Sequence, residues 1–266
     1  MEFGQQPFVE AVQSLARRGV LPTSLDTAGL RELSKEVREE AFFSARNQIE
    51  RVLEGQKAAI MSILEPSQVR RADRVTAENP EGWVTEGFNP TTARVRIKEL
   101  LQEADYRPEA GEEGTIKDLS SDRRIDLVVD TQTRLAQGRG MQLQGLDADV
   151  VEMWPAWELY RQEERKEKRD WLARFMAAGQ QSGRALGDGW TVQGGEMVAL
   201  KGHPIWEALG SSALFDDGLD VSYPPFAFSS GMWVREVDRK RCEELGILAA
   251  KERIEHKEKG NEDERE

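Results

Sequence analysis

The sequence predicts an α+β fold that is mostly α, with an elongated N-terminal helical region and a small C-terminal α+β module. Charged residues make up 32% of the chain and hydrophobic residues only 38%, which is typical of long solvated helices. Apolar residues recur at helical spacing in the first half, whereas most of the seven tryptophans follow residue 150. We therefore expect a helical, partner-contacting region over 1–147, an α+β module over 148–248 and a charged, disordered tail over 249–266.

The whole-chain composition narrows the classes of function. A formal net charge of -12 gives no overall field that attracts nucleic acid, so nonspecific coating of DNA is not expected. Cys242 is the single cysteine, which excludes an intramolecular disulfide and a cysteine-based metal knuckle. The first residues lack the pattern of a signal peptide, and no apolar stretch is long enough for a membrane span. These features predict a soluble protein made inside the cell.

The first half contains the most regular apolar pattern of the chain. A short helix is predicted over 7–20, ending near Gly19. Apolar residues then recur every three to five positions and predict one amphipathic helix over about 27–65, with Gly55 as its weak point and Pro66 at its end. Forty helical residues would span ~60 Å. A helix of this length needs an antiparallel neighbour or another subunit, so we expect self-association through 27–65.

Two more helices are predicted before residue 147. The dipeptide Asn89-Pro90 is typical of a helix start, and the inner face of this helix lies within 93–104. The Gly- and Glu-rich segment 105–121 predicts a loop, and the next helix starts at Asp122. Three glycines are expected to loosen the chain after it: Gly138, Gly140 and Gly145.

The last third alternates short strands and helices. Residues 153–160 predict a strand with Trp157 and Leu159 on one face, followed by a charged helix around Trp171 and Phe175. A flexible segment is expected over 179–195, a short strand over 196–200 and a helical turn over 204–209. Asp238 is expected to cap a last short helix, over 239–245.

The stretch from His203 to Trp233 is the most informative part of the sequence, because aromatics, prolines and glycines stand where a linker would be polar. Each large aromatic side chain can bury ~150–250 Å², and Pro224 and Pro225 fix the backbone between them. We expect ordered irregular structure packed into a core. An alternative is a ligand pocket that stacks a sugar or a base, formed by Trp154, Trp157, Trp206, Tyr223 and Trp233.

Catalytic and metal-binding motifs are scarce. His203 is interpreted as structural rather than as a base or ligand, and His256 lies in the tail, so no Ser-His-Asp set can be assembled. The acidic segment 216–220 partly resembles a calcium loop but lacks its spacing and closing Glu, and is interpreted as an exposed turn. Neither a phosphate-binding loop nor a nucleophile elbow is present. We predict no catalytic, cofactor or metal site.

Three segments resemble the Mu F-like minor head family of phage head morphogenesis proteins. The first extends from Phe88 through the loop at 111–121 into the helix around Arg124, the second covers 157–161, and the third covers 197–232. The residues that carry the resemblance or the expected aromatic core are Trp157, Tyr160, His203, Pro204, Trp206, Tyr223, Pro224, Pro225, Phe226, Phe228, Gly231 and Trp233. The better-known members have a cysteine- and histidine-containing stretch after the paired prolines, whereas this chain has 228–233 without either residue, so no metal site is carried over.

The resemblance implies a non-enzymatic minor head protein that associates with the portal protein, the inner capsid or scaffold proteins during assembly. Such a protein would be found in the bacterial host cytoplasm and then in the virion; contact with DNA is left open. One alternative is a nucleotide-transferring toxin carried on the same module, with a site built from Glu196, Glu207 and Arg235. Another alternative is an acidic scaffold or adaptor protein unrelated to phage.

Overall fold

The computed structural model describes residues 9–65, 67–70, 72–81, 83–86, 89–165 and 169–249. The helices are α1 (Val9–Arg17), α2 (Thr27–Arg31), α3 (Lys35–Glu40), α4 (Glu50–Leu64), α5 (Pro90–Glu103), α6 (Asp122–Gly145), α7 (Ala148–Met153), α8 (Trp171–Gln181), α9 (Ile205–Gly210), α10 (Arg239–Glu244) and the 3-10 turn Ala72–Arg74. The strands are β1 (Gly19–Val20), β2 (Ala41–Phe42), β3 (Ser67–Arg70), β4 (Trp83–Glu86), β5 (Ala156–Arg161), β6 (Trp190–Gln193), β7 (Glu196–Leu200) and β8 (Met232–Val237). The predicted class, α+β and mostly α, is confirmed.

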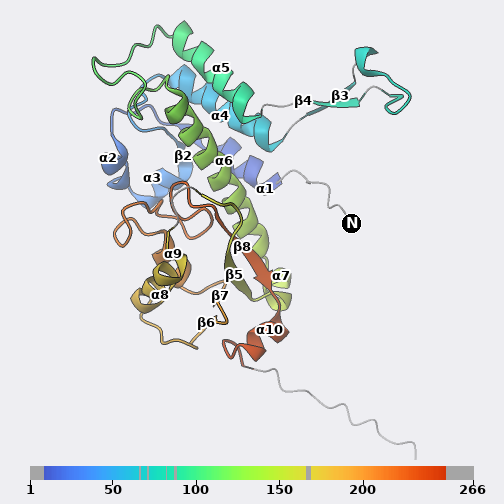
Figure 1. The fold of residues 1–266 in the computed structure, drawn as a ribbon, viewed down its shortest axis with the longest axis vertical. Coiled ribbons are helices and arrows are strands. Elements are labelled where there is room, and N and C mark those ends of the chain that lie inside the picture. Colours follow the sequence, from blue (N-terminus) through green and yellow to red (C-terminus); the bar gives the residue numbers. More distant parts are fainter. Residues whose placement is uncertain are drawn as a thin grey trace, which may run out of the picture.

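Helices α4, α5 and α6 pack together in the first half of the chain, with α1 along α6 (Figure 1). The Asn89 side chain and Thr92 form a reciprocal capping box at the start of α5, which confirms the predicted helix start. The predicted inner face of α5 is buried against α4 and α6. Gly55 lies within the continuous helix α4 and faces Leu100, whose side chain would overlap a methyl group at this position.

The single helix predicted over 27–65 is wrong. Asp26 and Ser34 each accept a backbone N–H with a side-chain oxygen and so begin the separate helices α2 and α3. After β2 the chain continues irregularly to α4, with Arg46 at φ 60° and Asn47 fully buried. The apolar stripe is therefore divided among three helices: Ser34 starts a new helix inside the periodic pattern, and the irregular segment after β2 separates α3 from α4. Self-association through one long helix loses its basis.

The glycines of α6 lie inside the helix and do not loosen it, contrary to the prediction. Each allows another segment to approach the helix closely. A methyl group at Gly138 would overlap the carbonyl oxygen of Pro224, one at Gly140 would lie 2.9 Å from the Ala11 nitrogen, and one at Gly145 would lie 2.9 Å from Trp157 Cζ2. These positions make α6 a helix that packs closely on several sides.

The second half contains an antiparallel sheet with the strand order β6-β7-β5-β8. Trp157 and Leu159 lie buried on the same face of β5, as predicted, and α8 and α9 cover this face. On the opposite face, Cys242 of α10 packs against Ala156 and Val237. Strands β6 and β8 were not predicted, because the first falls in a glycine-rich segment and the second in the aromatic stretch expected to be irregular.

Polar contacts join α6 to the second half of the chain. Arg134 forms ion pairs with Asp130 at 2.8 Å and with Glu163, and the Gln142 amide donates to Ser222 Oγ at 2.9 Å. The predicted domain boundary at residue 147 stays a prediction. Helix α6 ends before this boundary but contacts residues on both sides of it. Pro66, Phe88 and the predicted tail from residue 250 onward lie outside the described residues.

Candidate functional site

Trp206 lies at the centre of the core beneath the sheet. Its ring packs edge-on against Trp157 at 5.7 Å and Phe175 at 6.0 Å, and it stacks on Phe226 at 6.0 Å between centroids. The indole N–H donates to the Leu200 carbonyl at 2.9 Å, so its polar atom is satisfied inside the core. The sequence placed these aromatics in a core, and the structure confirms that interpretation.

His203 is buried at the start of α9, next to the exposed Pro204. Its Nδ1 accepts the backbone N–H of Ile205 at 3.1 Å, which gives the ring a structural role at the first helical turn. Burial lowers the pKa of His203, as does the positive charge of Arg184, although Asp188 opposes this shift. The imidazole is therefore held in its neutral form.

The loop 223–228 packs against α6 through its paired prolines. The peptide bond between Pro224 and Pro225 is cis, and the Pro224 carbonyl rests on Gly138 of the helix. The Pro225 carbonyl accepts from Ser230 Oγ at 2.6 Å, and the same hydroxyl accepts from the Met232 N–H at 3.1 Å, which leads the chain into β8.

Gly231 makes the turn from this loop into β8 possible. It has φ 67°, and any side chain here would overlap the Glu163 carbonyl. The Gly231 carbonyl accepts backbone N–H groups from Gln162 and Glu163 at 2.9 and 3.0 Å. This glycine of the family-like motif therefore has a backbone role.

The remaining aromatics of the motif do not join Trp206. Tyr160 and Trp233 are register partners on β5 and β8, on the sheet face opposite Trp157. Tyr223 is buried beside Arg139, and Trp154 is exposed. The alternative of one aromatic stacking pocket is not formed, because its five residues fall on different layers.

The acidic segment 216–220 binds arginines. Asp217 forms ion pairs with Arg169 at 2.9 Å and Arg174 at 2.5 Å, and Asp220 pairs with Arg38 at 2.7 Å. The expectation of an exposed turn is therefore wrong for these two carboxylates, which are half-buried. Within the described ranges, no three His, Cys, Asp or Glu side chains lie close enough together to hold a metal ion.

Two of the three residues proposed for the enzyme alternative form ion pairs with other side chains. Arg235 forms a bidentate pair with Glu158, both contacts at 2.7 Å, and Glu196 pairs with Arg241 at 2.8 Å. These pairs lie on the sheet face that α10 covers, whereas Glu207 is on α9, which covers the other face. The structure does not bring the three proposed residues together.

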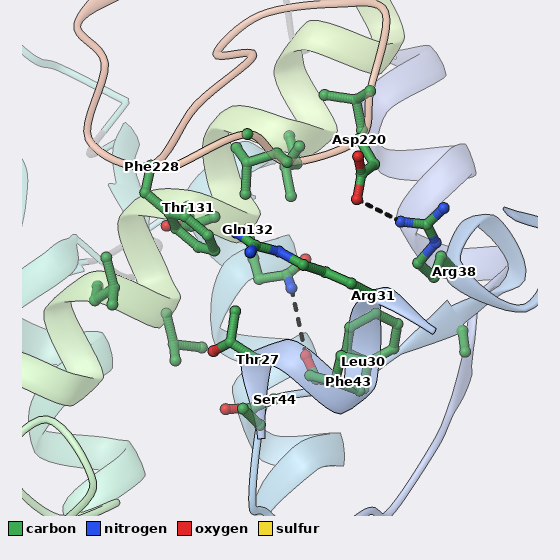
Figure 2. A pocket seen from close by; sticks show the side chains of 18 of the residues that line it. Thr27, Leu30, Arg31, Arg38, Phe43, Ser44, Thr131, Gln132, Asp220 and Phe228 are labelled. Carbon is green, nitrogen blue, oxygen red and sulfur yellow. Dashed lines mark hydrogen bonds and ion pairs between the residues drawn. The ribbon is translucent and has the colours of Figure 1, made fainter. Parts of the chain in front are cut away.

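A cavity of ≈ 170 Å³ lies between α6, the segment from α2 to residue 45, and the loop 218–228 (Figure 2). Aliphatic side chains from α2, α6 and the loop form much of its wall, together with Phe228 of the motif. Four arginines also line it: Arg18, Arg31, Arg38 and Arg124. The site therefore combines an aliphatic wall with several positive charges.

The cavity is electropositive because its arginines mostly bond to neutral groups. Arg31 donates to the Asp216 carbonyl at 2.5 Å, and Arg124 donates to Ser44 Oγ and the Ala45 carbonyl at 2.8 Å each. Burial lowers the pKa of Arg124, and the charge of Arg46 adds to this effect. Burial raises the pKa of Tyr223, so its hydroxyl keeps its proton.

Sequence reasoning did not single out this site. It placed Arg31 and Arg38 inside the single helix over 27–65, which does not form, and it assigned no role to Arg18 or Gln132. The local pattern carried no signal for them, because the wall is assembled from segments as distant in sequence as Arg18 and Phe228.

Comparison of the chain with protein-family models, curated proteins and solved structures found no match. None of the described helices combines the length and apolar character needed to cross a bilayer.

Proposed function

We propose that this chain is a non-enzymatic morphogenesis protein of a phage or prophage head, present in the host cytoplasm during assembly and then at the portal vertex or inner capsid. The observation that carries this proposal is that residues of the family-like motif have structural roles. Trp206, Pro224 and Gly231 build the core, the contact with α6 and the turn into β8, respectively. A motif used in this way supports a packed assembly module rather than a reaction centre.

An assembly protein also needs a surface for its neighbours. Four large apolar side chains are exposed around the junction of α6 and α7: Leu143, Leu146, Met153 and Trp154. Met153 has 53% of its surface exposed and Leu146 has 46%. Exposed apolar side chains that share one surface are typical of contact sites between proteins. We infer that this junction faces the portal or capsid partner.

Co-expression with a candidate portal protein from the same genome tests the proposal. We expect the two proteins to co-purify through size exclusion, and the double variant Leu146→Glu, Met153→Glu to lose the portal while keeping the wild-type melting temperature. Val95→Glu is the matched control, because Val95 is 54% exposed on α5, which lies at the opposite end of α6 from α7 (Figure 1). Failure of the wild type to bind the portal, or equal loss in the control, would contradict the proposal.

A further inference from the structure

We propose that the cavity against α6 binds the C-terminal residue of a polypeptide that ends in an apolar amino acid. The arginines would receive the carboxylate, the aliphatic wall would enclose the side chain, and Gln132 would accept the last peptide N–H. This inference rests on the cavity itself and does not depend on the proposed function.

The cavity is large enough to enclose one apolar side chain, and part of its wall is aliphatic. Leu30, Leu127, Val128, Leu135 and Val221 line it. Its volume of ≈ 170 Å³ compares with an engineered apolar cavity of about 150 Å³ that binds benzene. A leucine or phenylalanine side chain therefore fits, and the rest of the ligand would leave through the side that is open to solvent.

The excess of positive side chains in the lining favours an anionic ligand. Arginines outnumber the carboxylates of Glu39 and Asp220 at the cavity. Among the residues that the structure describes, only Arg38 of the four arginines forms an ion pair with a carboxylate, that of Asp220. Guanidinium groups bind carboxylates through two parallel hydrogen bonds, which are among the stronger polar contacts in proteins.

Several polar atoms at the cavity are buried and have no hydrogen-bond partner among the residues that the structure describes: Arg18 Nε, Arg38 Nε, Thr131 Oγ1 and Gln132 Oε1. Thr131 is 7% exposed. The Gln132 amide nitrogen donates to the Phe43 carbonyl at 3.4 Å, so its oxygen points away from that carbonyl (Figure 2). Buried polar atoms without partners cost free energy unless a ligand or water satisfies them.

These features together select the class of ligand. A simple carboxylic acid supplies the anion and the apolar group but gives Gln132 no donor. An N-acylated apolar amino acid supplies all three, and the C-terminal residue of a polypeptide has this chemistry. A free N-acyl amino acid has the same chemistry, so the experiment must separate the two sources.

Titration of the ¹⁵N-labelled full chain followed by NMR tests the assignment. N-acetyl-leucine should shift the amide signals of α2 and α6 saturably, with a Kd of roughly 1 mM for a ligand of about a dozen heavy atoms. N-acetyl-leucinamide should bind at least about tenfold more weakly, because it lacks the charge-assisted contacts. A ten-residue peptide ending in leucine should bind at least as well as N-acetyl-leucine, and its C-terminal amide should not.

Two variants and a control locate the site. Arg31→Gln removes one guanidinium group, and Thr131→Val removes the unpartnered hydroxyl; we expect the first to weaken binding about tenfold and the second about threefold. Arg51→Gln makes the same charge change at an exposed position on α4 and should bind as the wild type does. A melting curve for each variant separates lost binding from lost folding.

Several results would overturn the inference. They are the absence of saturable shifts with N-acetyl-leucine, equal affinity for the acid and the amide, and equal weakening in the Arg51→Gln control. Binding of N-acetyl-leucine without binding of the peptide would refute a polypeptide terminus and assign the cavity to a free N-acyl amino acid.

Discussion

The contact between α6 and the paired prolines predicts that Gly138→Ala destabilises the protein, whereas helix propensity alone predicts that it stabilises the helix. In an exposed helix, Gly→Ala stabilises by about 1 kcal/mol. At Gly138 the added methyl would overlap the Pro224 carbonyl oxygen and lie 2.9 Å from its carbon and 3.1 Å from Tyr223 Cδ2. The obstacle is backbone that cannot rotate away, so overpacking should cost about 3 kcal/mol, at the top of the usual range.

The net expectation for Gly138→Ala is a loss of about 2 kcal/mol in the free energy of unfolding. The melting temperature should fall by about 4–8 °C for a chain of this size. Urea denaturation followed by tryptophan fluorescence and by far-UV circular dichroism measures the change. Gly202→Ala is the control, because it is exposed and has no atom within 4 Å of the new methyl. A Gly138→Ala protein as stable as the wild type, or more so, would refute the close docking of the loop on α6.

Three more predictions concern the core, an ion pair and the cysteine. Trp206→Ala should lower the free energy of unfolding by about 3–5 kcal/mol in urea denaturation, and an unchanged midpoint would place Trp206 outside the core. Arg134 lowers the pKa of Glu163, so this stabilisation is present above the ordinary glutamate pKa of 4.5 and is lost as the pH falls through the lowered value. The stability difference between wild type and Arg134→Gln should therefore shrink from pH 6 to pH 3, and a constant difference would argue against the pair. Burial raises the pKa of Cys242 to about 11, so a thiol reagent at pH 8 should label it only after urea is added; rapid native labelling would contradict its burial.

The elements that could be predicted from the sequence have local signals. The start of α5 at Asn89-Pro90, the start of α6 after Ser121 and the cap of α10 at Asp238 each depend on residues within one helical turn. The same holds for the alternating faces of β5. Capping and alternation act over a few residues, so they can be read without knowledge of the rest of the fold.

The failures have a shared physical reason. Periodicity over 27–65 indicated one helix because apolar spacing does not report where a side chain caps the backbone. The glycines of α6 seemed to be breakers because their partners, at Ala11, Trp157 and Pro224, are distant in sequence. Likewise, the cavity depends on Arg31 of α2 and Gln132 of α6 lining one site, an arrangement that no local pattern encodes.

The glycines of α6 also set a limit on how this helix can vary. They occur at three positions along one continuous helix, and each faces a different neighbour. One residue inserted between Ile125 and Gly138 would turn everything after it by about 100° and advance it by about 1.5 Å, since a helix has 3.6 residues per turn. All three glycines would then face away from the segments that pack against them. We therefore expect insertions and deletions to be tolerated in loops such as 105–121 and not in α6.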